Sequence, residues 1–168
     1  MSPPHLYVRP QKHTMHVHLL VGESRGEPAY ETIHVEALGG RRFRVEFTPR
    51  LAYGTAAGDE IELADDGTFA VVSRAGNVAV RVFSPQSLAN DEPSLTTLVE
   101  STLDGHLDGN VGHGLAYTIP IQAGFPAIEQ LFDEFVAATS GVVWEFGNIY
   151  AADGSPIGWW EVSGRDDG

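Results

Sequence analysis

Three histidines on two neighbouring predicted strands are the best candidates for chemistry in this chain. His16 and His18 are two residues apart in an alternating segment, so on a strand their side chains project from the same face, about 7 Å apart. Two imidazoles at that separation can bind one metal ion, and His34 on the polar face of the next strand could supply a third ligand. A solvated polar face explains the same pattern, and so does a pH-sensitive patch without metal.

A glycine-rich stretch, residues 103–114, holds the second set of candidates. His106 and His113 lie there beside Asp104 and Asp108, and a histidine next to a carboxylate can transfer protons. The acids do not follow the alternating spacing and final Glu of a calcium loop. A mobile or hairpin loop accounts for the same composition.

The motifs that mark common enzyme classes are missing from the sequence. There is no cysteine, which excludes disulfides, thiol catalysis and cysteine-based zinc sites. There is also no phosphate-binding loop with Lys, no Gly-x-Ser-x-Gly and no His-Glu-x-x-His. We therefore expect a non-catalytic binding protein without a cofactor. The alternative is a small-ligand binder or metal-dependent enzyme with a His-lined pocket in the first half.

Charge is distributed very unevenly along the 168 residues. The formal net charge is −13, and residues 82–164 contain eleven Asp and Glu but no Lys or Arg. Such a segment disfavours direct nucleic-acid binding, which needs cations against phosphates, and attracts a basic protein. An acidic surface can also serve solubility alone. An immunity or antitoxin-type protein that holds a basic partner is the concrete form of the binding hypothesis.

Two groups of residues in the acidic half are candidates for contacting such a partner. Glu129, Asp133 and Glu134 lie on the exposed side of a predicted helix, where like charges four residues apart are slightly destabilising. Trp159 and Trp160 are adjacent, so on a strand they point to opposite faces. One of them would then be an exposed interface anchor, for a partner or for a homodimer. In the alternative, both are covered.

No stretch of the chain predicts a membrane or secretory segment. The longest apolar runs fall well short of the roughly 18 residues that a membrane span needs. Residues 1–5 lack the basic start and apolar run of a secretory signal. We expect a cytoplasmic protein.

The first half of the chain alternates apolar and polar residues with a period of two, which is typical of half-buried strands. Turn residues such as Gly39-Gly40 and Gly76-Asn77 separate the alternating segments. Short strands at this density favour a small antiparallel β-barrel or a curved sheet. The predicted strands are 14–21, 31–37, 42–48, 61–63, 69–73 and 78–83.

The second half changes to helical spacing. Pro126 suits a first helical position, and the apolar stripe that follows it consists of Ile128, Leu131, Phe132, Phe135 and Val136. Helices over 94–103 and 126–139, with strands at 106–108, 115–121 and 142–149, extend the strand at 78–83 into a ferredoxin-like order. The predicted class is α+β, with a β-rich subdomain at 1–86 and an acidic α+β subdomain at 87–168 that can form one unit.

Short motifs with regular spacing run through residues 30–83. They are a strand with a leading acid, a Phe-Arg-Val strand, a proline, a Tyr-Gly and Gly-Asp run and a small-residue turn, at 30–35, 43–45, 49, 52–61 and 71–82. In these motifs the segment resembles DUF4265, an uncharacterised bacterial family. Arg50 and Leu51 stand where the family is expected to have aromatics. The resemblance implies a shared fold and no activity.

The Tyr53–Asp59 stretch inside this segment has a structural and a functional explanation. Gly54 and Gly58 permit backbone angles closed to other residues, and Asp59 can accept hydrogen bonds from its own turn. In the functional explanation the stretch covers the mouth of a pocket, and Tyr53 or Asp59 contacts a ligand.

Overall fold

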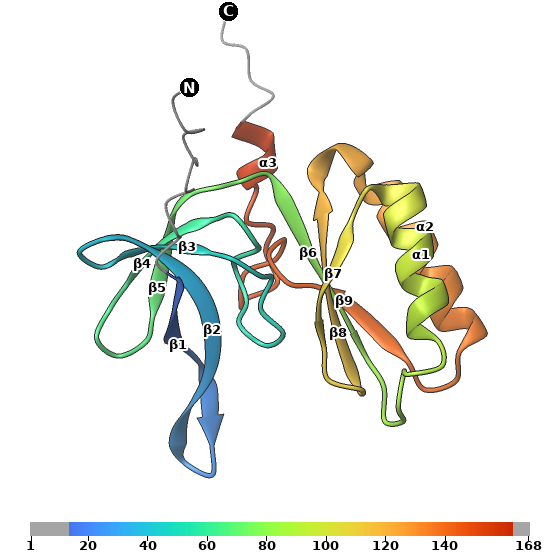
Figure 1. Cartoon of the computed structure of the whole chain (residues 1–168), viewed down its shortest axis with the longest axis horizontal. Helices are drawn as coiled ribbons and strands as arrows, with labels where there is room; N and C mark the ends of the chain where they lie inside the picture. Colours follow the sequence, from blue (N-terminus) through green and yellow to red (C-terminus); the bar gives the residue numbers. More distant parts are fainter. Residues whose placement is uncertain (1–13, 163–168) are drawn as a thin grey trace, which may run out of the picture.

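The alternating segments of the first half form a five-stranded antiparallel sheet. The computed structural model describes residues 14–162 (Figure 1), and the strands follow one another in the sheet in chain order. Their bounds are β1 (Thr14–Ser24), β2 (Glu27–Gly39), β3 (Arg42–Val45), β4 (Glu60–Leu63) and β5 (Phe69–Ser73). The predicted strands are therefore confirmed, with differences at their ends.

One face of this sheet is apolar, as the alternation predicts. Val17 lies opposite Ile33, and both are buried with Leu19, Val35 and Ile61. The strand expected to continue to residue 48 ends at Val45, because the Val45 N–H and C=O bond to Asp59 and Gly58 of the following loop. Phe47, expected on the apolar face, is exposed as a result.

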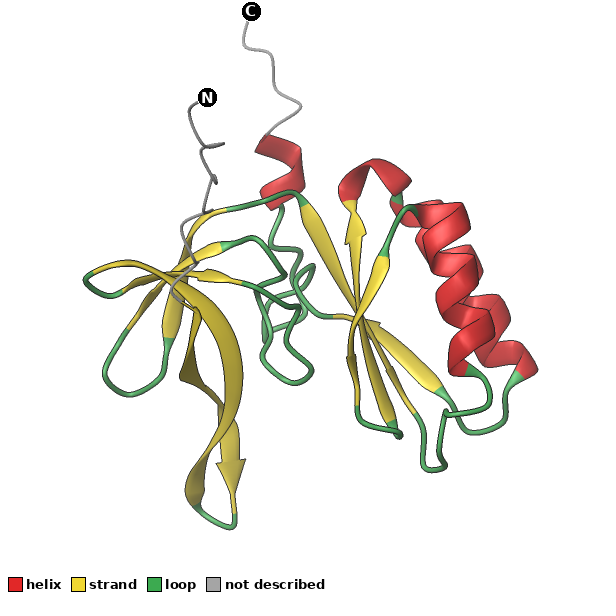
Figure 2. Cartoon of the chain, in the orientation of Figure 1, coloured by secondary structure: helices red, strands yellow, loops and turns green. Residues whose placement is uncertain are grey.

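The outer strands of the first sheet do not close into a barrel. Within residues 14–162, β1 pairs only with β2, and β5 pairs only with β4. A hydrogen bond of 2.9 Å from Leu20 N to Gly67 O joins β1 to the turn between β4 and β5. The barrel is thus not confirmed, and the sheet is a strongly curved one (Figure 2).

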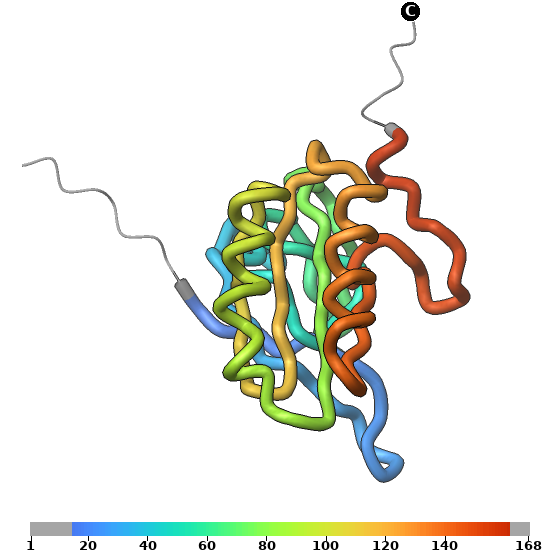
Figure 3. Tube along the Cα trace, turned by 90° about the vertical axis from the view of Figure 1, so that its right-hand side faces the viewer, coloured from blue at the N-terminus to red at the C-terminus, as the bar shows by residue number. Residues whose placement is uncertain are grey.

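The second sheet has four strands in the order β7-β8-β6-β9, and all its pairs are antiparallel. Its strands are β6 (Asn77–Phe83), β7 (His106–Asn110), β8 (Gly114–Pro120) and β9 (Val143–Phe146). Helices α1 (Glu92–Leu103) and α2 (Phe125–Ala138) lie side by side over one face (Figure 3). The strand–helix–hairpin–helix–strand order is the one predicted. The chain enters this sheet between Ser73 and Asn77, earlier than the expected subdomain boundary at 86.

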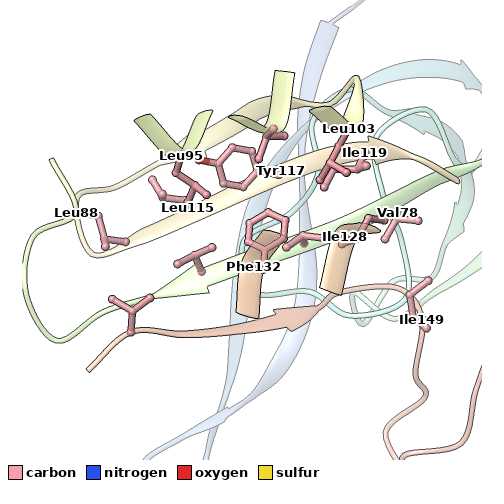
Figure 4. Close-up of a cluster of buried hydrophobic side chains, with 14 residues drawn as sticks. Val78, Leu88, Leu95, Leu103, Leu115, Tyr117, Ile119, Ile128, Phe132 and Ile149 are labelled. Atoms are coloured by element: carbon pink, nitrogen blue, oxygen red, sulfur yellow. The ribbon is translucent and has the colours of Figure 1, made fainter. Parts of the chain in front are cut away.

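Apolar side chains from both helices and from strands β6 and β8 form most of the larger core (Figure 4). Leu95 and Val99 of α1 and Ile128 and Phe132 of α2 pack on alternate residues of β6 and β8. Leu131, Phe135 and Val136, the other members of the predicted helical stripe, are half-buried at its margin. A short 3-10 helix, Ile121–Ala123, leads into α2, and α3 (Trp159–Val162) ends the described chain.

Among residues 14–162 no helix combines the length and apolarity needed to span a bilayer. Residues 1–5, on which the expectation about targeting depends, lie outside the described part of the chain.

Candidate binding groove at the edge of the second sheet

Strand β9 sends its side chains alternately to the two faces of the second sheet. Trp144 and Phe146 lie on the helical face, where their rings meet Phe132 and Phe125 of α2 at centroid distances of 5.5 and 5.7 Å. Glu145 points to the opposite face, toward the first sheet. The edge of this strand is therefore bordered by aromatic rings on one side and by a carboxylate on the other.

A groove with a volume of about 750 Å³ runs around this edge, and we call it the β9 groove. Its aromatic lining consists of Tyr53, Trp144, Phe146 and Tyr150, and its acidic lining of Glu129, Asp133 and Glu145. Ala151, Ala152 and Gly154 complete the wall, and no Lys or Arg within residues 14–162 lines the groove. Carboxylates between aromatic walls form a site suited to a cation.

Two carboxylates reach the β9 groove from α2. Asp133 Oδ1 accepts a hydrogen bond of 2.8 Å from the indole Nε1–H of Trp144. Glu129 lies one turn earlier on the same helical face and has no hydrogen bond or ion pair within residues 14–162. Both keep free acceptor capacity for a ligand. Glu134, predicted with them, faces a different groove between the helices and accepts a hydrogen bond from Gln130.

Glu145 is held in place by a buried arginine and a tyrosine. The hydroxyl of Tyr53 donates to Glu145 Oε2 over 2.8 Å, and Nη2 of Arg81 lies 3.1 Å from Glu145 Oε1. The guanidinium of Arg81, only 1% exposed, also lies 4.2 Å from the centre of the Tyr53 ring. Desolvation and the Glu145 carboxylate raise the pKa of the Tyr53 phenol. A Cβ at Gly147 would lie 3.0 Å from the Ala79 Cβ and 3.4 Å from Arg81 Nε, so this glycine permits the close approach to Ala79 of β6.

Tyr53 reaches the second sheet because buried carboxylates shape the loop that carries it. Glu31 accepts the backbone N–H groups of Arg50, Leu51 and Ala52 at 2.8, 3.0 and 2.8 Å. Asp59 accepts the N–H groups of residues 56 and 75, each at 3.0 Å, and its burial raises its pKa. Asp59 is thus structural, and of the two predicted ligand contacts in this loop only Tyr53 lines the groove.

The family assignment follows from a match over most of these elements. Residues 31–144 match the model of a domain of unknown function, DUF4265. The chain belongs to this family. The resemblance predicted for 30–83 is confirmed and extends through α2 into β9. The match covers Tyr53, which lines the groove, and also Glu31 and Arg81, which support Tyr53 and Glu145 from outside the lining.

The fold recurs in a solved structure, described as a hypothetical protein from Neisseria gonorrhoeae. The two chains are 15% identical and superpose with a TM-score of 0.59 over 83% of this chain and 96% of that one. At this identity the likeness shows the fold alone. No curated protein matches this DUF4265 chain.

The predicted histidine set is only partly brought together. His16 lies directly opposite His34, with ring centroids 4.2 Å apart, and Phe47 packs edge-on against His34. His18 instead pairs with Thr32 through a 2.9 Å hydrogen bond. Within residues 14–162 no three His, Asp or Glu groups are placed to hold a metal ion. A second cavity of about 630 Å³ includes His18 but neither of the other two, so the expected His-lined pocket is not formed by this set.

The histidines of the glycine-rich stretch lie far from the β9 groove, around β7. His106 begins β7 and lies 3.0 Å from Asp108, whereas His113 lies in the turn just after this strand. Asp108 also accepts the N–H of Thr48, so it links β7 to the loop after β3. The stretch is the predicted hairpin, and it does not unite the two imidazoles.

The paired tryptophans differ from expectation. Trp159 and Trp160 lie on α3 rather than on a strand, and both are half-buried. Trp159 Nε1–H donates to the Asn148 carbonyl over 3.0 Å, and Trp160 packs edge-on against Phe125. The expectation of one exposed tryptophan is not met, and the alternative in which both are covered agrees better with the structure, because both rings pack against the larger core.

Most of the groove lining escapes sequence reasoning, including Trp144, Glu145, Phe146 and Tyr150, and so does Arg81, which pairs with Glu145. Glu145 looks like any other acid of the second half. Arg81 is the one basic residue within the otherwise apolar run of β6, and that contrast is the signal that could have found it.

Proposed function

We propose that this protein is a non-catalytic binding protein that holds a basic segment of a partner protein in the β9 groove. An immunity or antitoxin role is the concrete form of the proposal. The observation that carries it is the lining of the groove, which combines three carboxylates and four aromatic rings and includes no Lys or Arg from the described part of the chain.

The physical support comes from two attractions that a basic side chain would find together there. Carboxylates beside low-dielectric walls attract a cation more strongly than carboxylates in open water. A cation over an aromatic face gains about 0.5–2 kcal/mol. The absence of Lys and Arg from residues 82–164 means that no basic residue of that segment competes for the site.

The experiment compares two double variants that remove the same charge. The probe is a blocked, flexible Gly-Ser peptide with interspersed Arg and Lys, titrated calorimetrically into the protein near physiological salt. E129Q/D133N should weaken binding about tenfold or more, which corresponds to about 1.4 kcal/mol. E100Q/E134Q changes two exposed helical acids outside the groove and should leave affinity within about twofold.

Nonspecific charge attraction gives a different result. If both double variants weaken binding equally, or if binding vanishes entirely at moderate salt, the field of the acidic half is responsible and the groove is not a site. Absence of any binding by the basic peptide also overturns the proposal.

A further inference from the structure

The outer edge of β9 has backbone groups that can pair with another strand. In the antiparallel β6–β9 pair, Gly147 N–H donates to Ala79 O over 2.8 Å, and Glu145 lies opposite Arg81. Since hydrogen-bonded positions alternate, residues 143, 145 and 147 face β6, and Trp144 and Phe146 direct their N–H and C=O groups away from it. No strand within residues 14–162 pairs with that side.

A strand added there would bring a side chain to the α2 carboxylates. The residue opposite Trp144 would have its Cβ about 5 Å from that of Trp144, on the same face of the sheet. On this face Asp133 already contacts the Trp144 indole, and Glu129 lies one helical turn away. The edge and the acidic groove are therefore two parts of one surface.

We infer that the partner segment is an extended strand that pairs antiparallel with β9 and places an arginine opposite Trp144. This inference rests on the proposed function and names the conformation and the side chain of the ligand. A planar guanidinium stacks on an aromatic ring and forks onto a carboxylate, whereas an ammonium is a compact, strongly hydrated charge.

The chain itself contains the same combination on the other face of the strand. There the Arg81 guanidinium lies over the Tyr53 ring and beside Glu145. On the α2 face, Trp144 and Asp133 supply the ring and the carboxylate, and the ligand supplies the arginine. A second copy of this chain fits the edge poorly, because it would bring two acidic grooves together.

The test uses a blocked Thr-Val-Arg-Val-Thr peptide and four variants of it. In the proposed register the arginine's own N–H and C=O pair with Trp144, so N-methylation of the arginine amide should weaken binding about tenfold or more. N-methylation of the following valine, whose N–H points away from β9, should change affinity by less than about threefold. Replacement of Arg by Lys should weaken binding about tenfold, and by neutral citrulline still further.

The outcomes separate this inference from the proposed function. If the flexible basic peptide binds in a Glu129- and Asp133-dependent way but both N-methylated peptides behave alike, strand addition is wrong and the groove remains a site. Equal affinity for Lys and Arg overturns the choice of arginine. If sedimentation shows a dimer of the free protein that the peptide does not dissociate, a second copy occupies the edge and the inference fails.

Discussion

Two sets of acidic side chains in this molecule have opposite relations to the rest of the chain. Glu31 and Asp59 are buried, and backbone N–H groups of nearby loops surround their oxygens. Glu129 and Asp133 are exposed, and together they make a single hydrogen bond within residues 14–162. The first set shapes a loop. The second set has hydrogen-bond acceptors that remain available to a ligand outside the chain.

This difference teaches that acidity alone does not identify a binding surface. A buried carboxylate that accepts several backbone N–H groups has little capacity left for a ligand, and its removal leaves those N–H groups without a hydrogen-bond acceptor. An exposed carboxylate can be changed without structural consequence. Stability measurements can therefore distinguish the two sets before any ligand is known.

Removal of the Glu31 carboxylate should have the largest effect. Glu31→Ala leaves the N–H groups of residues 50–52 without their acceptor, and an unsatisfied buried group costs roughly 1–3 kcal/mol. Since only the Ala52 N–H is fully buried, we expect a loss of about 3 kcal/mol in the free energy of unfolding, measured by urea denaturation.

Glu129→Ala is the matched control for this prediction. It removes the same chemical group from an exposed helical position and should change stability by no more than about 0.5 kcal/mol. Equal losses in the two variants would erase the distinction between loop-shaping and groove carboxylates.

The ion pair between Arg81 and Glu145 combines a buried partner with a partly exposed one. Substitution of the two partners should therefore change stability by different amounts. Arg81 is buried, and neither its Nε nor its Nη2 makes a hydrogen bond within the described residues, while Glu145 is about one-third exposed. Glu145→Ala leaves a buried guanidinium without its counter-charge, which we expect to cost about 2 kcal/mol. Arg81→Met replaces the buried charge by an apolar chain and should cost less than about 1 kcal/mol.

Thermal and urea unfolding of both variants tests this asymmetry. If Arg81→Met is the more damaging change, the guanidinium contributes more to the fold than its unmet hydrogen bonds imply. The Arg81–Glu145 pair would then be a structural feature, like Glu31 and Asp59, rather than one available to a ligand, like the exposed acids.

The fold was largely predictable because its signals are local. The alternation of apolar residues in β1 and β2 and the helical stripe of α2 follow from periods of two and 3.6. The order of the second sheet then follows from the sequence of elements. The early end of β3 at Val45 was not predictable, since it depends on hydrogen bonds from a loop.

The site was less accessible, because it is assembled from distant parts of the chain. Helical periodicity placed Glu129 and Asp133 on an exposed face, but only the fold brings the Tyr53 hydroxyl to Glu145 across 92 positions. Likewise, His16 and His34 meet because the β1–β2 register aligns them, and that same register places His18 opposite Thr32. A pair of adjacent tryptophans has no period at all, so their helix could not be predicted.

Two tyrosines sharpen the comparison between core and groove at alkaline pH. Tyr117 is fully buried, and desolvation is the main cause that raises its pKa from 10.0 to about 12. Because the folded pKa exceeds the unfolded one, the native state holds this proton more tightly, and stability falls as pH rises through that window. At about pH 11 the loss should be roughly 1 kcal/mol.

Phenylalanine variants test which tyrosine causes this loss of stability at alkaline pH. Tyr117→Phe keeps the ring but removes the titration and the hydrogen bond with Thr96, so it should cost about 1 kcal/mol near neutrality and flatten the decline above pH 10. Tyr53, 56% exposed at the groove, also has a raised pKa, but solvent limits its effect, and Tyr53→Phe should leave the decline nearly unchanged. The measurement is urea unfolding at a series of pH values. If Tyr53→Phe flattened the dependence of the free energy of unfolding on pH more than Tyr117→Phe, the prediction would be wrong, because Tyr53 would then be more desolvated than its exposure indicates.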